Sequence, residues 1–151
     1  MSASVVMIAS GKGGTGKSTL AVLLGAELAA RGRRVLLVEL DCGLRSVDLI
    51  AGASGRTVYD LGDVLEGRCE AGKALVESPV YHDLYLISAP YSGGRIEPAA
   101  LRVFLERAGP VFDTILLDTA AGMGRPFRAA LGVAGRALLV LTPDPVAARD
   151  G

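Results

Sequence analysis

The segment Ser10–Thr19, with the sequence SGKGGTGKST, constrains the fold of this chain more than any other segment. Gly11, four further residues and then Gly16, Lys17 and Ser18 match the phosphate-loop pattern G-x-x-x-x-G-K-[ST]. Glycines let successive backbone N–H groups curl around a phosphate without Cβ clashes, and a helix that starts there adds positive potential. We therefore expect Lys17 to reach the β- and γ-phosphates of a nucleotide, and the Ser18 hydroxyl to ligate Mg²⁺.

The residues on either side of this loop have the pattern that a phosphate loop requires. Residues 4–9, SVVMIA, form a short β-branched run that predicts a buried parallel strand. After the loop a helix is predicted to end at Gly32, because apolar residues recur at helical spacing at Leu20, Leu23, Leu24 and Leu28. Strand, glycine loop and helix thus follow one another in the expected order.

Two further apolar runs each end in an acid. Residues 35–40 predict a second buried strand that leads directly into Asp41, and residues 113–118 predict another that ends at Asp118. Acids at the carboxyl ends of parallel strands point into the crevice where α/β proteins bind ligands. Asp118 has the form of a Walker B aspartate, so we expect its carboxylate to hold Mg²⁺ opposite Ser18.

The remaining pattern completes an α/β domain. Strands are predicted over residues 84–88 and 137–141, and a helix that opens at Pro98 has an apolar stripe at Leu101, Phe104, Leu105 and Ala108. At 151 residues, of which half are apolar, the chain is expected to form one domain. We predict an open parallel sheet with helices on both faces, and a nucleotide at the carboxyl ends of its first, second and fourth strands.

A lysine directly after the first glycine gives K-G-G-T-G-K-S, which resembles the deviant phosphate loop of the MinD/ParA family of ATPases. The segments DCGLRSVDL, residues 41–49, and VYDLGDVLEG, residues 58–67, look most similar to the MinD branch, the septum-site regulators. The resemblance implies a P-loop ATPase domain over residues 1–151, with ATP and Mg²⁺ as cofactors. It places nucleotide contacts at Gly11, Lys12, Gly13, Gly14, Thr15, Gly16, Lys17, Ser18, Thr19 and Gly122, catalytic roles at Lys12, Lys17 and Asp41, and the metal ligands at Ser18 and Asp118.

The same resemblance implies an activity and partners. The family couples ATP hydrolysis to homodimerisation, with Lys12 reaching the partner's phosphates and Asp41 orienting the attacking water. It meets division-site regulatory proteins, is cytoplasmic, and attaches peripherally to the inner membrane through a C-terminal amphipathic helix. Because these 151 residues contain neither that helix nor the base-binding region, the domain is expected to be incomplete. Ala120 and Gly124 stand where the family usually has a proline and an acid, so the chain departs from the family pattern in the loop used for switching.

Four alternatives remain at this point. Gly11-x-Gly13-x-x-Gly16 also fits the dinucleotide fingerprint of a Rossmann domain, with Glu39 as the ribose-binding acid. A ParA-like DNA-partition ATPase, a nucleotide sensor without hydrolysis and an inactive fragment are the others. The formal net charge is zero and like charges form no run, so no nucleic-acid partner is expected. Cys42, Cys69 and the single histidine, His82, lack the spacing of a zinc or disulfide site.

Overall fold

The computed structural model describes residues 3–11, 16–42, 46–91, 95–122 and 124–141. Its centre is a six-stranded sheet in the order β3-β4-β2-β5-β1-β6. The strands are β1 (Ser4–Ala9), β2 (Val35–Glu39), β3 (Val76–Glu77), β4 (Leu84–Ile87), β5 (Thr114–Asp118) and β6 (Arg136–Leu139).

All five predicted strands are present, and they pair with one another in parallel. The short edge strand β3 was not predicted, and it runs antiparallel to β4. Its two residues are too few to produce a period-2 pattern in the sequence. The predicted parallel architecture is therefore confirmed, with one antiparallel addition at an edge.

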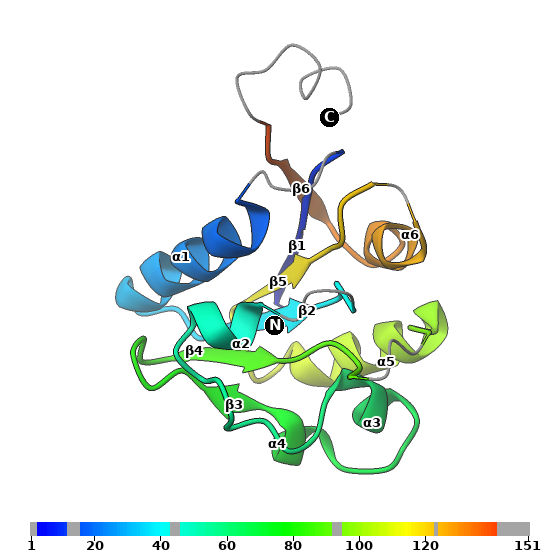
Figure 1. Ribbon diagram of the computed structural model, residues 1–151, viewed down its shortest axis with the longest axis horizontal. Helices are drawn as coiled ribbons and strands as arrows, with labels where there is room; N and C mark the ends of the chain where they lie inside the picture. The colour runs from blue at the N-terminus through cyan, green and yellow to red at the C-terminus, as the bar shows by residue number, and fades with distance from the viewer. Residues whose placement is uncertain (1–2, 12–15, 43–45, 92–94, 123, 142–151) are drawn as a thin grey trace.

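Helices cover both faces of the sheet, as predicted (Figure 1). The helices α1 (Lys17–Ala30) and α2 (Val47–Ile50) pack on one face, around a core that includes Val35, Leu37 and Leu116. The other face carries α3 (Leu61–Leu65), α4 (Ala71–Ala74), α5 (Pro98–Ala108) and α6 (Arg125–Leu131). The four residues of the apolar stripe predicted for α5 are its four buried residues.

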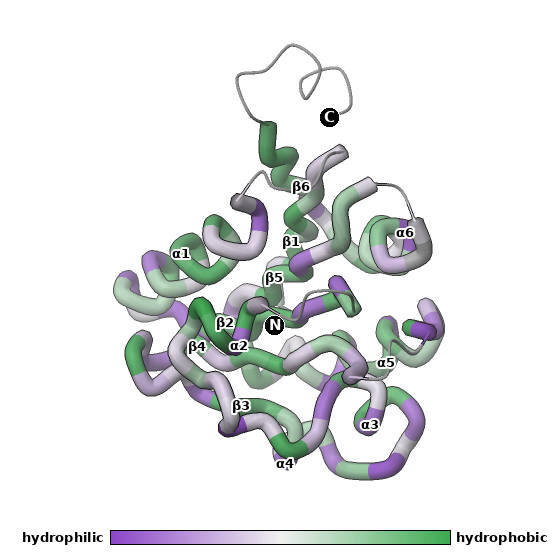
Figure 2. The backbone as a smooth tube through the Cα atoms, in the orientation of Figure 1, coloured by the Kyte–Doolittle hydropathy of each residue, from purple (hydrophilic) through white to green (hydrophobic). Residues whose placement is uncertain are grey.

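The buried face of α1 differs from the leucine pattern. Its buried apolar positions are the small residues Ala21, Val22, Gly25 and Ala29, whereas Leu20 is 42% and Leu23 52% exposed. A Cβ at Gly25 would lie 2.8 Å from Leu84 Cδ1, so this helix lies very close to the sheet. Because the helix lies so close to the sheet, only small side chains fit between them, and Leu20 and Leu23 face solvent. Figure 2 shows that much of the α1 tube has the colour of hydrophobic residues.

The order of the strands decides between two alternatives from the sequence. In a Rossmann fold the first and second strands are neighbours, but here β5 lies between β1 and β2. The strand that ends in Asp118 is therefore beside the strand that leads into the phosphate loop. This arrangement contradicts the dinucleotide alternative.

In the described part of the chain, every helix is too short or too polar to cross a bilayer.

Candidate nucleotide-binding site

The described part of the phosphate loop joins β1 to α1 at the carboxyl edge of the sheet. Ser10 is 2% exposed and directly follows β1, and Gly16 has φ +78° before α1 begins at Lys17. A Cβ at Gly16 would meet nothing within 4 Å, so glycine is required here by the left-handed backbone and not by space. The carbonyl of Gly16 accepts from the Leu20 amide, while the amides before Leu20 have no acceptor within the helix.

Three predicted site residues meet at this edge. The Lys17 ammonium lies 2.7 Å from Asp118 Oδ1, and the Ser18 hydroxyl donates to Asp118 Oδ2, also at 2.7 Å. Asp118 is fully buried and Lys17 is 7% exposed. Asp118 reaches this position because its strand pairs with β1, where Asp118 is the register partner of Ile8. The sequence prediction that Ser18 and Asp118 lie close enough to share one ion agrees with this geometry.

The donor atoms fit Mg²⁺ and a nucleotide polyphosphate. A hydroxyl and a carboxylate are oxygen ligands of the kind that Mg²⁺ prefers, and a lysine with a helix N-terminus suits phosphate oxygens. Ser18 and Asp118 would hold the ion, and Lys17 with the first amides of α1 would hold the phosphates. Bound there, Mg²⁺ supplies charge neutralisation for the phosphate oxygens.

The segments that follow β2 and β5 are tied to this edge by backbone hydrogen bonds. The Leu40 amide donates to the Asp118 carbonyl at 2.8 Å, which brings the half-buried Asp41 to the same edge. The Gly122 amide donates to the Ser10 carbonyl at 3.0 Å, with Gly122 at φ +87°. The Gly122 amide is therefore engaged by the protein in this structure, and contact with a γ-phosphate requires that bond to be exchanged.

The other predicted contacts divide into described and undescribed residues. Gly11 is half-buried at the start of the loop, and Thr19 is exposed in the first turn of α1. Four predicted residues lie outside the described part of the chain, namely Lys12, Gly13, Gly14 and Thr15. Their assignment, including the trans role of Lys12, stays a prediction.

Glu39 has a role that the sequence did not indicate. It ends β2, is 1% exposed, and is the register partner of Asp118. Its Oε2 accepts the Val47 amide at 3.0 Å, and its Oε1 accepts the Ala89 amide at 3.1 Å. Burial raises the pKa of the Glu39 carboxyl above its ordinary value of 4.5, and the charge of Asp118 adds to this rise. The two hydrogen bonds from backbone amides act in the opposite direction without cancelling it. Buried and bonded to two backbone amides, this carboxylate is not presented to a ribose.

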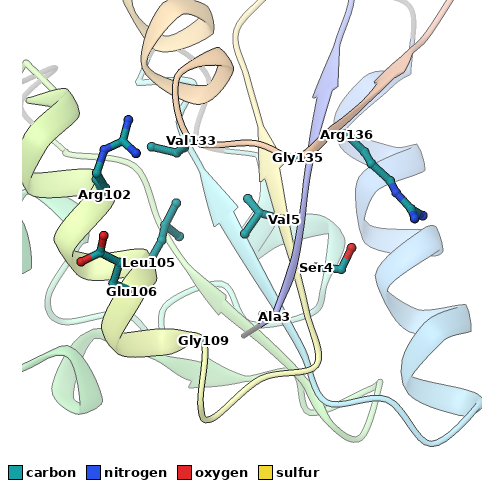
Figure 3. Close-up of a pocket in the computed structure, with 10 residues that line it drawn as sticks. All are labelled: Ala3, Ser4, Val5, Arg102, Leu105, Glu106, Gly109, Val133, Gly135 and Arg136. Carbon is teal, nitrogen blue, oxygen red and sulfur yellow. The ribbon is translucent and has the colours of Figure 1, made fainter. Parts of the chain in front are cut away.

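Two hollows lie away from this site. One of about 420 Å³ lies between α5 and the starts of β1 and β6, where Val5 and Leu105 face it and Arg136 points away (Figure 3). Another of about 740 Å³ has a mostly apolar lining that includes Leu65, Phe104 and Phe112. The first is at the amino ends of the strands, opposite the edge where parallel sheets bind nucleotides.

His82 has neighbours that its sequence context did not predict. Its Nδ1 lies 3.1 Å from Glu77 Oε1 and its Nε2 3.5 Å from Asp83 Oδ2, on the hairpin that joins β3 to β4. The histidine side chain is 84% exposed, as expected for a surface loop. These exposed pairs lie at the start of β4, away from the phosphate loop.

The comparisons with known proteins agree with this geometry. Residues 6–133 match the CobQ/CobB/MinD/ParA nucleotide binding domain. The septum site-determining protein MinD of Bacillus subtilis (strain 168) is 38% identical over 148 residues, which are 96% of this chain and 55% of that protein. The chain thus spans little more than half the length of such relatives.

Solved structures give the same result. The MinC:MinD cell division protein complex of Aquifex aeolicus matches with a TM-score of 0.89 and 39% identity, over 98% of this chain and 60% of that one. MinD complexed with Mg-ADP from Pyrococcus horikoshii OT3 matches with a TM-score of 0.87 and 27% identity, over 98% of this chain and 61% of that one. The chain therefore belongs to the CobQ/CobB/MinD/ParA family of nucleotide-binding domains.

Proposed function

We propose that this protein binds Mg-ATP and hydrolyses it, as a dimerisation switch of the MinD type that regulates placement of the division septum. One observation carries the proposal: Lys17 and Ser18 from the start of α1 both contact the fully buried carboxylate of Asp118, from a strand 100 residues later. A phosphate-loop lysine, a hydroxyl and a Walker B carboxylate at one point are the parts that a Mg-nucleotide site needs.

The chain's own residues contribute by position and charge. Lys17 neutralises phosphate charge, and Asp118 and Ser18 fix the place of the metal. Asp41 holds the attacking water from the segment that follows β2. Little covalent chemistry is required of the protein in phosphoryl transfer, so precise placement of these groups accounts for most of the catalysis.

The proposal extends to a dimer and to a binding partner. We propose an ATP-dependent homodimer in which Lys12 contacts the partner's phosphates, and a division-site regulator as binding partner, since a MinD relative forms a MinC:MinD complex. Because the chain spans 55% of the Bacillus subtilis MinD length, membrane attachment is proposed only for a longer protein that carries a C-terminal amphipathic helix.

Titration calorimetry with ATP in the presence of Mg²⁺ or EDTA tests the site. Lys17→Ala is expected to abolish binding, whereas Ser18→Ala is expected to bind ATP with an affinity that depends less on Mg²⁺, since one of its two ligands is lost. Lys73→Ala serves as the matched lysine control, since Lys73 is exposed on α4. Equal affinities in the parent and in Lys17→Ala would refute the proposed site.

Further assays separate the remaining alternatives. Phosphate release distinguishes an ATPase from a nucleotide sensor that binds without turnover. A gel shift at low salt detects the non-specific DNA binding expected of a ParA-like partition ATPase. Lys12→Ala is expected to spare ATP binding but lose dimerisation and turnover, and weak binding equal to that of Lys17→Ala would contradict its trans role.

A further inference from the structure

The carboxylate of Glu39 connects two segments that leave the sheet at the proposed nucleotide site. Val47 is the first residue of α2 and lies eight positions after Glu39, while Ala89 follows the end of β4 and lies 50 positions after it. Each amide donates to a different oxygen of the same side chain. A single carboxylate thus bonds the segment after β2 to the segment after β4.

Both amides need this acceptor. Val47 opens α2, so its amide has no acceptor within the helix, and the preceding Ser46 side chain makes no capping hydrogen bond. Ala89 lies beyond the paired residues of β4, whose register with β2 is described as far as Val38 and Ile87. Both Val47 and Ala89 are fully buried. A buried amide without an acceptor is costly, so the carboxylate fixes the positions of both segments.

The carboxylate holds this position at an electrostatic cost. Glu39 is buried and is the register partner of Asp118, a second buried acid. Two carboxyl groups close together disfavour each other's charge, and burial disfavours both charges. A residue chosen only to fill this space would be apolar, which indicates that the two accepted hydrogen bonds are the reason for the acid.

Asp41 lies in the segment between Leu40 and Val47, of which the structure describes residues 40–42 and 46–47. This segment leaves β2 at Leu40, whose amide donates to the Asp118 carbonyl at 2.8 Å, and returns to Glu39 at Val47. Both ends of the segment are therefore fixed on the last residues of neighbouring strands. Fixing the ends of a short loop reduces the positions open to a residue between them.

We propose that Glu39 is a positioning residue for ATP turnover: by bonding the Val47 and Ala89 amides, it holds the Asp41 segment in place at the carboxyl edge of β2. The inference rests on the proposed function. It assigns Glu39 no contact with the nucleotide, so its loss acts on turnover and leaves nucleotide affinity in place.

Two substitutions and one control test this role. Glu39→Gln keeps the shape, but its NH₂ group donates where the carboxylate accepts, so one of the two backbone amides loses its acceptor. Glu39→Asp keeps an anionic acceptor one methylene shorter. Ser88→Ala is the matched control, since the Ser88 side chain is also fully buried at the end of β4 but its hydroxyl has no hydrogen-bond partner among the described residues.

Steady-state kinetics and nucleotide binding give the first readout. Glu39→Gln is expected to lower kcat about ten-fold or more while the Kd for ADP changes less than about three-fold, because the phosphate loop is untouched. Glu39→Asp is expected to recover most of the lost kcat, and Ser88→Ala to match the parent. A parallel loss of kcat and ADP affinity, or parental kcat in Glu39→Gln, would overturn the role.

Amide hydrogen exchange gives a readout that does not require hydrolysis. In Glu39→Gln, exchange is expected to accelerate about ten-fold or more in the segment whose amide loses its acceptor, either that of Val47 or that of Ala89, with no change in Ser88→Ala. Acceleration in neither segment would overturn the role of Glu39 as the acceptor for both amides. If the parent protein binds ATP without hydrolysing it, the proposed function fails, while this exchange experiment still decides whether Glu39 joins the two segments.

Discussion

The ion pair between Lys17 and Asp118 should be strongly coupled in the protein without nucleotide. Its charged atoms are 2.7 Å apart, and the side chains are 7% and 0% exposed. At an effective dielectric constant of about 20, two unit charges at this distance attract by about 6 kcal/mol. Removing both charges from water costs several kcal/mol per ion, so the net contribution of the pair is well below this attraction.

Removing one partner is a different perturbation, because it leaves the other charge buried alone. Asp118→Asn is expected to lower the free energy of unfolding by about 3 kcal/mol, and Lys17→Met by about 2 kcal/mol, since the Ser18 hydroxyl still donates to Asp118. The double variant should lose only about 3 kcal/mol in total. The coupling energy between the two sites is then about 2 kcal/mol.

Urea unfolding in EDTA without nucleotide measures the four free energies, since any bound ligand would add its own stabilisation. Arg31 and Glu27 form the control pair, because their charged atoms are 2.9 Å apart but the side chains are 73% and 60% exposed. An exposed i,i+4 pair typically couples by about 0.3–0.5 kcal/mol. If the Lys17–Asp118 cycle is additive within about 0.5 kcal/mol, the burial argument is wrong.

Three further outcomes are expected. Gly25→Ala should destabilise the fold by about 1 kcal/mol in urea unfolding, because its new Cβ would lie 2.8 Å from the fully buried Leu84 side chain. We expect this overpacking to outweigh the gain in helix propensity, and a more stable variant would contradict the argument. The hydrogen bond from the Asp60 backbone amide lowers the pKa of the Asp63 carboxyl below its ordinary 3.8. The stability that this carboxylate adds is therefore present above pH 3.8 and is lost as the pH falls through the lowered pKa. Asp63→Asn should lack this loss in acid unfolding curves. Gly122→Ala and Gly67→Ala should each lower the free energy of unfolding by about 1 kcal/mol, because both glycines have positive φ, +87° and +77°, although a Cβ at either would meet no atom within 4 Å. Only Gly122→Ala should alter ATP turnover. Equal turnover in the two variants would show that the Gly122 loop plays no part in hydrolysis.

The elements whose signal is local could be predicted from the sequence. The strand before the phosphate loop, the end of α1 near Gly32 and the buried stripe of α5 each depend on a few neighbouring residues. Strand order depends on which distant segments pair, and no local pattern states that β5 inserts between β1 and β2. The Walker B form of Asp118 indicated its nearness to the phosphate loop, and the register with β1 accounts for it.

Side-chain burial on α1 shows where periodicity is insufficient. Apolar residues lie on several sides of this helix, so its leucines and its small residues give competing stripes. The distance between helix and sheet decides between them, and at Gly25 it leaves no room for a Cβ, which would lie 2.8 Å from Leu84 Cδ1. The buried face of α1 could therefore not be predicted from the pattern of apolar residues alone.

The site residues divide in the same way. The meeting of Lys17, Ser18 and Asp118 could be predicted because each belongs to a motif with a fixed spacing or position. Glu39 could not be assigned correctly, because its role depends on amides eight and 50 positions away. An acid at the end of a buried strand was the available signal, and it is equally typical of a ribose ligand.

The loop after β5 shows how a departure from the family pattern is tolerated. The Thr119 hydroxyl donates to the Ile8 carbonyl at 2.8 Å, and the Gly122 amide to the Ser10 carbonyl at 3.0 Å. These bonds attach the loop to β1 and to the start of the phosphate loop without using the side chains at positions 120 and 124. Replacement of a proline and an acid there by Ala120 and Gly124 therefore leaves these two attachments intact.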